Sequence, residues 1–224
     1  MTPQEFSNEF DVLYNNIMSN QAPSLNEYEK SVFLTQAQES IILEIYNGQF
    51  NDDSFESTEE VTSYINSLVK QVRLTTPIQQ QGISEHSVFY QLPEDLWFIT
   101  YESARLQDDR LGCKNGHEVI VKPITQDTYN RVSKNPFRGY GENRVLRLTM
   151  NNLSELISKF NIESYFIRYI SKPEPIILED LSDYGVSIDN KTQVTECRLN
   201  PAIHRTILNR AVKLAKAVWA SGVQ

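Results

Sequence analysis

The chain has 224 residues, of which 40% are hydrophobic and 10% aromatic, and this is enough apolar material for the core of one large or two small domains. Its formal net charge of −8 argues against a general nucleic-acid binder, because attraction to phosphates dominates the sequence-independent part of that affinity. No stretch approaches the roughly 18 uninterrupted apolar residues of a membrane span, and the opening "MTPQEFSNEF" lacks the pattern of a secretion signal. Two cysteines do not make a disulfide framework, which fits a reducing compartment.

The charge is distributed unevenly along the chain. Residues 1–76 hold twelve acids and three bases, and residues 77–199 hold seventeen acids and fourteen bases. Residues 200–224 hold four bases and no acid. The acidic start and the basic end therefore need separate explanations.

Three helices are predicted before residue 77. Thr2, Pro3 and Glu5 form a helix-start signal of the capping-box type. Helical spacing then follows at Phe6, Phe10, Leu13, Tyr14 and Ile17. A longer helix is expected over residues 25–47, with Gly48 as its C-cap and an apolar side formed by Tyr28, Val32, Phe33, Ala37, Ile41 and Ile45. A third apolar stripe, behind a Ser57–Glu60 capping box, is formed by Val61, Tyr64, Ile65, Leu68 and Val72.

The middle of the chain reads as β-rich. Short segments rich in β-branched and aromatic residues are separated by turn signals, and they lie at 86–93, 96–106, 118–124, 144–150 and 165–170. Asn115-Gly116 and Asp189-Asn190 predict hairpins. Residues 124–137 predict a short helix, and "LSELISKF" at 153–160 is interpreted as a second one.

The end of the chain is helical again, with Asn200 as N-cap and Pro201 at the first position. This helix should return to pack with the first three. We therefore expect an α+β fold with a helical domain formed by residues 1–76 and 200–224, and a β-rich, sandwich or barrel-like domain at 77–199. The regular alternation of helix and strand that a doubly wound sheet needs is absent from the pattern.

The sequence shows no catalytic constellation. Cys113 and His117 have half the spacing of a zinc site, but Cys197 and His204 do not supply the second half. No serine stands on a nucleophile-elbow motif, and "RGYGEN" and "NDDSFE" are poor matches to phosphate and calcium loops. We predict no catalytic residue, no metal, no cofactor and no enzymatic activity.

Several stretches together resemble the ring proteins of crAss-like bacteriophages, which are similar to the head-to-tail connector adaptors of short-tailed phages. The resemblance covers nearly the whole chain, keeps the motif order, and rests on residues 10–48, "LPEDLWFITYE", "VKPITQDTYNRVSKNPF", "YFIRYISKPEPIIL" and "CRLNPAIHRTILNRAVKLAKAVW".

This resemblance implies a structural virion protein that is made in the host cytoplasm. It implies a ring, expected in twelve copies, that joins the portal to the tail and lines the DNA passage without binding DNA specifically. Expected partners are further copies of the chain, the portal protein and other tail ring proteins. The predicted helices favour the ring next to the portal, docked through the helical domain, with the β-rich domain continuing the tail tube. The alternative is a non-enzymatic regulatory or inhibitor protein that binds a host protein.

The segment "YFIRYISKPEPIILEDL" raises a question of its own, because prolines sit in sheets only at edges, bulges or strand ends. In one interpretation "KPEP" directs the chain off the sheet toward a neighbouring subunit. The inter-subunit contact would then be formed by Pro173, Pro175, Ile176, Ile177 and Leu178. In the other interpretation the prolines only protect an exposed sheet edge against aggregation.

The basic C-terminal helix admits two interpretations as well. Bases near a helix C-terminus complement the macrodipole, and an aromatic residue beside them is a plausible docking anchor. The predicted portal-docking residues are Arg205, Arg210, Lys213, Lys216 and Trp219. Alternatively, Trp219 closes the protein's own helical bundle.

Overall fold

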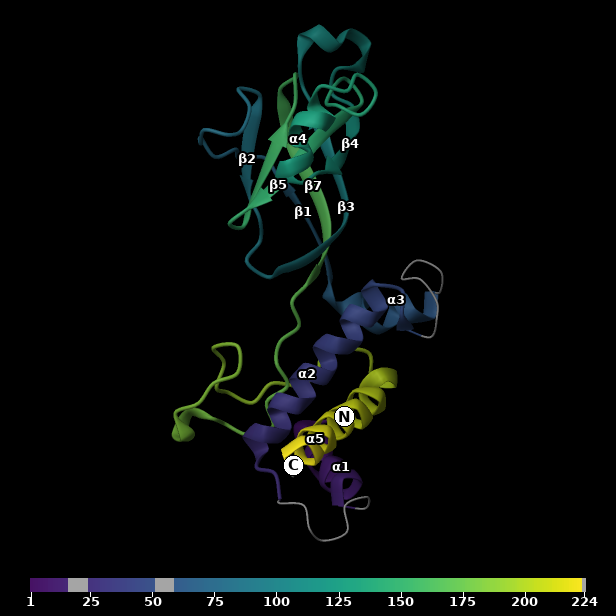
Figure 1. Ribbon diagram of the computed structural model, residues 1–224, viewed down its shortest axis with the longest axis vertical. Helices are drawn as coiled ribbons and strands as arrows, with labels where there is room; N and C mark the ends of the chain where they lie inside the picture. Colours follow the sequence, from purple (N-terminus) through teal and green to yellow (C-terminus); the bar gives the residue numbers. More distant parts are fainter. Residues whose placement is uncertain (16–23, 51–58, 223–224) are drawn as a thin grey trace. The chain divides into compact units, whose positions relative to one another are not determined.

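A computed structural model describes residues 1–15, 24–50 and 59–222, which form two compact units (Figure 1). The helical unit comprises Met1–Leu68 and Pro173–Gln224, and the sheet unit comprises Val69–Lys172. The α+β class is as predicted. The boundaries differ from those expected, because the sheet begins at residue 69 and residues 173–199 belong to the helical unit.

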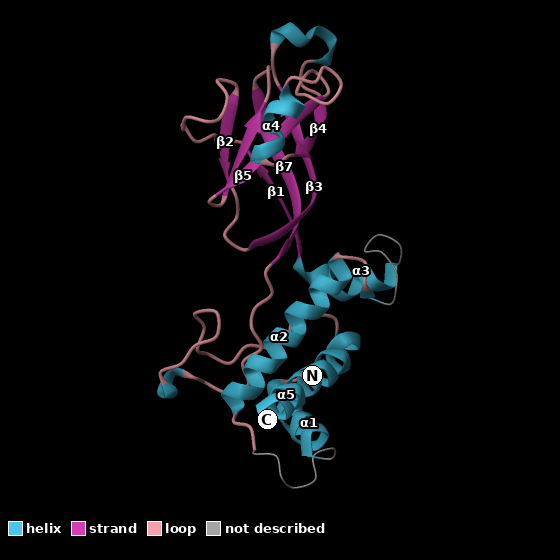
Figure 2. Ribbon diagram, viewed as in Figure 1, coloured by secondary structure: helices cyan, strands magenta, loops and turns pink. Residues whose placement is uncertain are grey.

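The helical unit contains the expected N-terminal and C-terminal helices (Figure 2). Its elements are α1 (Pro3–Asn15), α2 (Glu27–Tyr46), α3 (Glu59–Ile65) and α5 (His204–Gly222), with short 3₁₀ turns at Asn66–Leu68, Ser182–Tyr184 and Pro201–Ile203. Helix α5 contacts α2 and α1, and α3 contacts α2, so the last helix does pack with the first ones. The core between them includes Phe6, Phe10, Leu34, Ile41, Ile42, Ile45, Ile207, Leu208 and Ala211.

Local capping explains where these helices begin and end. The Thr2 amide donates to Glu5 Oε2 over 2.9 Å and the Glu5 amide donates to Thr2 Oγ1 over 3.3 Å, which confirms the predicted capping box. Helix α2 has a second capping box, between Asn26 and Glu29, that the sequence analysis missed. Gly48 follows the helix with a φ of +67°, a conformation that glycine adopts without steric cost. Asn200 caps the C-terminal helical segment as predicted.

Ile17 of the first predicted stripe and Ser57 of the predicted cap lie outside the described residues. The third stripe was extended too far, because the helix ends at Ile65 and Val72 lies in a strand.

The sheet unit is one curled sheet of seven strands in the order β1-β7-β3-β4-β5-β6-β2. Its strands are β1 (Val69–Leu74), β2 (Ser87–Gln91), β3 (Leu96–Leu106), β4 (Glu118–Pro123), β5 (Arg144–Met150), β6 (Leu153–Ile157) and β7 (Ile162–Ser171). All neighbouring pairs are antiparallel except β4 and β5, which are parallel and are connected through α4 (Gln126–Ser133). Helix α4 was predicted, and Tyr129 and Val132 pack on the buried Leu146, Leu148 and Ile157.

One helix prediction and two hairpin predictions need correction. Residues 153–160 hold strand β6 instead of a helix, because Asn151 and Asn152 adopt φ of 47° and 62° and make the tight turn of a β5–β6 hairpin. Strands β3 and β4 pair as expected, but a 3₁₀ segment, Asp109–Lys114, precedes Gly116 in their connection. Asp189-Asn190 forms its tight turn, but only the single Ile188–Lys191 bridge follows from it.

Candidate functional site: assembly surfaces

The histidines and cysteines have structural surroundings. Among the described residues no group of three or more His, Cys, Asp or Glu side chains could hold a metal ion. His117 Nδ1 lies 2.8 Å from the Lys114 carbonyl oxygen, and Cys113 is exposed. Cys197 donates to Gln38 Oε1 over 3.3 Å, and burial raises the pKa of its thiol to about 11. Burial therefore disfavours the Cys197 thiolate that a metal ligand or a nucleophile would need.

His204 is buried at the start of α5 and has partners on both ring nitrogens. The amino group of Met1 lies 2.8 Å from Nδ1, and the Leu199 carbonyl oxygen lies 3.0 Å from Nε2. Because an ammonium group can only donate, Nδ1 is the acceptor and Nε2 carries the proton. Burial lowers the pKa of His204, so the neutral ring is favoured in the folded chain.

The prolines of "KPEP" end a central strand. β7 pairs with β1 on one side and β3 on the other, so the idea that these prolines protect a sheet edge is wrong. After Ser171 the chain leaves the sheet, as the other interpretation predicted, and residues 173–178 enter the helical unit. We call residues 173–178 the strap.

The strap is fastened to α2 by polar side chains one helical turn apart. The Ile176 amide donates to Thr35 Oγ1 over 3.1 Å, and the Leu178 amide donates to Ser31 Oγ over 3.0 Å. Gln38 Nε2 donates to the Glu174 carbonyl oxygen over 2.9 Å. Side chains thus satisfy the backbone groups that a neighbouring strand would otherwise satisfy.

This position bears directly on the predicted inter-subunit residues. Pro173, Pro175, Ile176 and Ile177 are buried within their own subunit, and Leu178 is half-buried. Ile176 and Leu178 bond to α2 of the same chain, and Ile177 pairs with the backbone of Thr195. An inter-subunit role for them stays a prediction, and their burial weighs against it.

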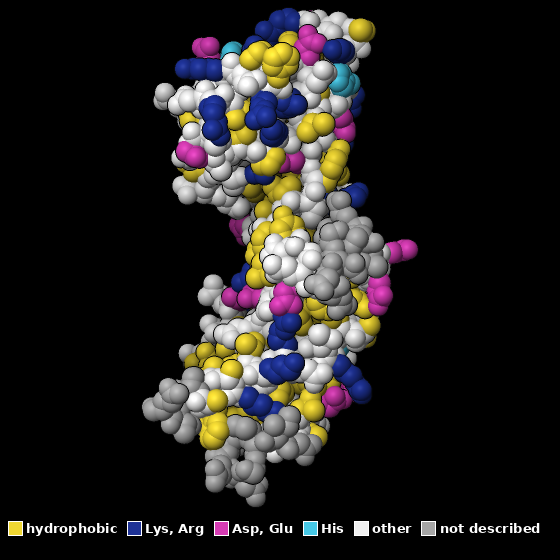
Figure 3. All heavy atoms as spheres, turned by 45° about the vertical axis from the view of Figure 1, so that its right-hand side comes forward, with side chains coloured by type: hydrophobic (Ala, Val, Ile, Leu, Met, Phe, Trp, Pro, Cys, Tyr) yellow, Lys and Arg dark blue, Asp and Glu magenta, His cyan; other side chains and the backbone are white. Residues whose placement is uncertain are grey.

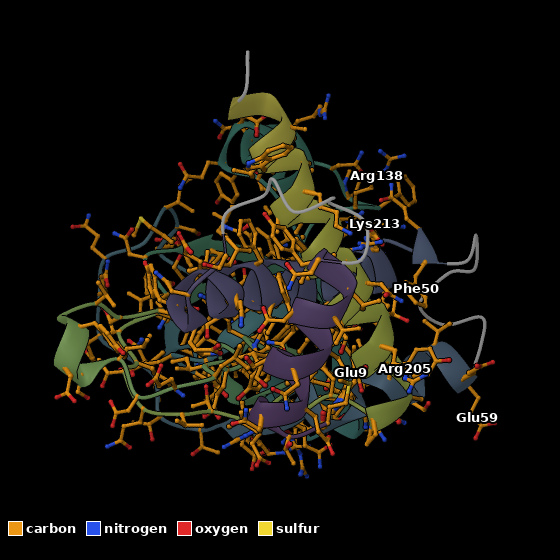
Figure 4. The ribbon with its side chains drawn as sticks, turned by 90° about the horizontal axis from the view of Figure 1, so that it is seen from below. Glu9, Phe50, Glu59, Arg138, Arg205 and Lys213 are labelled. Atoms are coloured by element: carbon orange, nitrogen blue, oxygen red, sulfur yellow. The ribbon has the colours of Figure 1, made fainter. Side chains whose placement is uncertain are left out.

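The C-terminal helix presents only part of its predicted basic face. Arg210 Nη1 lies 2.5 Å from Glu44 Oε1 and 2.9 Å from Ser40 Oγ, both on α2. Lys216 Nζ donates to the Leu13 carbonyl oxygen over 3.0 Å, so these two bases act within the bundle. Arg205 and Lys213 are exposed (Figure 4), and Trp219 is half-buried.

The two units differ in charge more sharply than the expected domains did. The sheet unit holds eleven acids and fourteen bases, a net charge of +3, whereas the helical unit holds eighteen acids and seven bases, a net charge of −11. Figure 3 shows Lys and Arg side chains gathered on the sheet unit with hydrophobic side chains among them. Residues 122–147 contribute six bases and two acids.

This basic segment is a candidate surface that was not predicted from the sequence. Its centre is the loop between α4 and β5, where Phe137 is 87% exposed beside Arg138. The available signal was an aromatic residue in a turn between basic residues, in "SKNPFRGYGEN".

A family model described as phage tail ring protein 3/4 matches residues 1–223. The chain belongs to this family. It is similar to a protein named Ring protein 3 from Bacteroides phage crAss001, with 49% identity over 96% of this chain and 95% of the relative. It is also similar to the protein named Ring protein 4/5 of the same phage, with 41% identity over 100% of this chain and 96% of the relative.

Family membership confirms the resemblance to crAss-like phage ring proteins and establishes a structural role in the tail of the virion. Two proteins of one phage, both named as ring proteins, are similar to this chain along nearly its full length. No helix among the described residues is long and apolar enough to cross a membrane.

Proposed function

We propose that copies of this chain close into a ring of the portal–tail complex, which joins the portal to the tail and surrounds the DNA passage. The observation that carries this proposal is the match of the ring-protein family to residues 1–223. A closed ring requires two different surfaces on each subunit, one for each neighbour. A chain with one basic and one acidic unit offers such a pair.

The expected partners are further copies of this chain, in twelve-fold number, together with the portal protein and other tail ring proteins. The similarity to two differently numbered ring proteins supports stacking of related rings. We keep the ring next to the portal as the proposed position, with α5 contributing to the contact. The predicted docking residues that still have exposed surface for a contact with the portal are Arg205, Lys213 and Trp219.

DNA would pass through the ring without being bound specifically. The net charge of −11 on the helical unit would repel phosphates from a bore that it lined, so that DNA slides without adhering. A highly charged surface also keeps a protein soluble, and this is the competing explanation. A ring whose bore is lined by the bases of the sheet unit would contradict the sliding proposal.

Particle composition tests the function. Tails separated from purified virions are analysed by quantitative mass spectrometry, with the portal protein of the same particles as the internal standard. A ring component is expected in a fixed ratio to the portal protein, with equal copy number for a twelve-fold ring. A regulatory or inhibitor protein would be absent from particles or present in no fixed ratio, and either result would contradict the proposal.

A further inference from the structure

The loop that connects α4 to β5 presents the most exposed large hydrophobic side chain of the described residues. Phe137 is 87% exposed, and the loop that carries it spans residues 134–143. A single exposed apolar residue on a surface is ordinary, so the case for a function depends on how this one is held.

The loop is held rigidly by its own hydrogen bonds. Asn135 Oδ1 accepts from the amides of Phe137 and Arg138 over 2.9 and 3.1 Å, and the Gly139 amide donates to the Asn135 carbonyl oxygen over 2.8 Å. Arg144 Nη1 donates to the Phe137 carbonyl oxygen over 2.8 Å. A Cβ atom at position 139 would stand 2.8 Å from the Asn135 carbonyl oxygen, so this shape requires glycine.

The Phe137 ring contributes nothing to this scaffold. The aromatic residue that anchors the loop is Tyr140, which packs against the Leu146, Leu148 and Ile157 cluster. A preorganised loop that presents an aromatic side chain to solvent has the properties of an interface anchor, because little conformational freedom is lost on binding.

The surroundings of Phe137 indicate an acidic partner. Lys134 and Arg138 flank it in sequence and are exposed, as is Arg131 in the last turn of α4. The nearby Glu142 is engaged by Lys114, with 2.7 Å between Nζ and Oε2. Bases alone would also attract DNA phosphates, but the exposed phenyl ring favours a protein pocket.

The helical unit contains a pocket with the complementary chemistry. About 390 Å³ in volume, it lies between the first turn of α2 and the 179–186 segment. We call it the Tyr28 pocket; it is lined by Asn26, Glu27, Tyr28, Glu179, Tyr184 and Val186. Its apolar and aromatic walls suit a phenyl ring, the exposed Glu179 carboxylate suits a guanidinium group, and no base is among the lining residues. The groove between α1 and α5 holds Arg205 as well as Glu9, so its charge does not favour Arg138 as the Tyr28 pocket does.

We propose that Phe137 and Arg138 of one subunit insert into the Tyr28 pocket of the next subunit. This contact rests on the ring proposed above and identifies the two surfaces that the ring joins. It is heterologous, with the basic loop of one copy on the acidic unit of its neighbour, and repetition of such a contact closes a ring when the rotation between neighbouring copies divides a full turn.

Self-association of the full chain tests the contact. Sedimentation velocity over a concentration series compares the wild type with Phe137→Ala, Arg138→Glu, Glu179→Arg and the double variant Arg138→Glu/Glu179→Arg. Glu179 is chosen because Glu27 already binds Lys30 within its own subunit. The matched controls are Ile120→Ala and Lys122→Glu, which alter an exposed apolar residue and an exposed base on β4.

Phe137→Ala is expected to weaken assembly about 30-fold, the size of an interface hot spot, with an unchanged melting midpoint. Each charge reversal should weaken assembly, the double variant should restore it, and the controls should assemble like the wild type. If Phe137→Ala assembles as strongly as the wild type, or if the double variant does not regain assembly, the proposed contact is wrong while ring formation itself still stands. Loss of double-stranded DNA binding in the loop variants with assembly unchanged would assign the loop to phosphates instead. A wild-type chain that stays monomeric throughout would contradict the self-assembly itself.

Discussion

Thr35→Val tests how the strap is fastened to α2. The Thr35 hydroxyl accepts a hydrogen bond from the Ile176 amide over 3.1 Å and lies 3.4 Å from the Ile176 carbonyl oxygen. Thr35 is 6% exposed and Ile176 is fully buried, so water cannot replace the hydroxyl. Valine has nearly the same shape as threonine, and the substitution therefore removes the hydrogen bond without opening a cavity.

The expected loss of unfolding free energy follows from the Ile176 amide, which Thr35→Val leaves without an acceptor. A buried donor that loses its acceptor costs about 1–3 kcal/mol, and the long contact to the carbonyl oxygen adds little. In a chain of this size each kcal/mol lowers the melting midpoint by about 2–4 °C, so a fall of about 2–12 °C is expected. Ser31→Ala removes the equivalent bond to the Leu178 amide, which measures 3.0 Å, and should act in the same direction.

Thermal unfolding followed by circular dichroism measures the midpoint, and hydrogen exchange with mass spectrometry reports on the strap. Thr35→Ser is the matched control, because it retains the hydroxyl and should keep the Ile176 amide protected. Thr35→Val should lower the midpoint and increase exchange in residues 174–178. A Thr35→Val protein with wild-type stability and an unchanged exchange rate in the strap would refute this explanation of how the strap is held.

Three further predictions concern buried charge, pH and the C-terminus. Glu102→Ala should cost about 3–5 kcal/mol in unfolding free energy. Glu102 accepts hydrogen bonds from Arg147 Nε and Tyr165 Oη, both at 2.7 Å, and its loss leaves the Arg147 guanidinium, whose side chain is only 12% exposed, without a carboxylate partner; a cost below about 1 kcal/mol in urea unfolding would contradict this. Because the pKa of His204 is lowered in the folded chain, its contribution to stability is complete above its unfolded pKa of about 6.5 and is lost as the pH falls below that value. The melting midpoint of the wild type should therefore fall as the pH is lowered through this range, and it should fall less in His204→Gln; an identical pH profile in the variant would argue against the buried neutral ring. Deletion of residues 217–224 should weaken portal binding with little change in melting midpoint, whereas a large fall in midpoint with binding retained would show that Trp219 serves the helical bundle.

Local signals predicted much of this fold. Thr2, Glu5, Gly48 and Asn200 marked helix ends through hydrogen bonds and φ preferences that depend on few neighbours. Strand β3 was predicted with its observed limits, because its run of β-branched and aromatic residues is long. Strand β6 was misassigned because "LSELISKF" fits a helical spacing, and the deciding signal was the Asn151-Asn152 turn before it.

The strap shows what could not be predicted. The prolines indicated correctly that the chain leaves the sheet, but its destination depends on Ser31, Thr35 and Gln38, which look like the polar side of an amphipathic helix. Helix α2 is instead buried on more than one side, and the sequence analysis left Leu34 and Ile42 out of its apolar face although both are fully buried. This second buried side of α2 becomes evident only from its contact with the strap, which lies about 140 residues further along the chain.

The candidate surfaces were predicted in part. The basic charge of α5 was evident from composition, but the engagement of Arg210 by Glu44 and of Lys216 by the Leu13 carbonyl oxygen depends on helix packing. In the sequence Phe137 is one aromatic residue in a turn among others, and only the structure shows that its side chain is exposed.

Cryo-electron microscopy of the portal–tail complex from the phage that encodes this chain tests the central claim most directly. We expect a closed ring of this chain around the DNA passage, between the portal and the rest of the tail, with the Phe137 loop of each copy in the Tyr28 pocket of its neighbour. A complete portal–tail complex without density for this chain would contradict the claim.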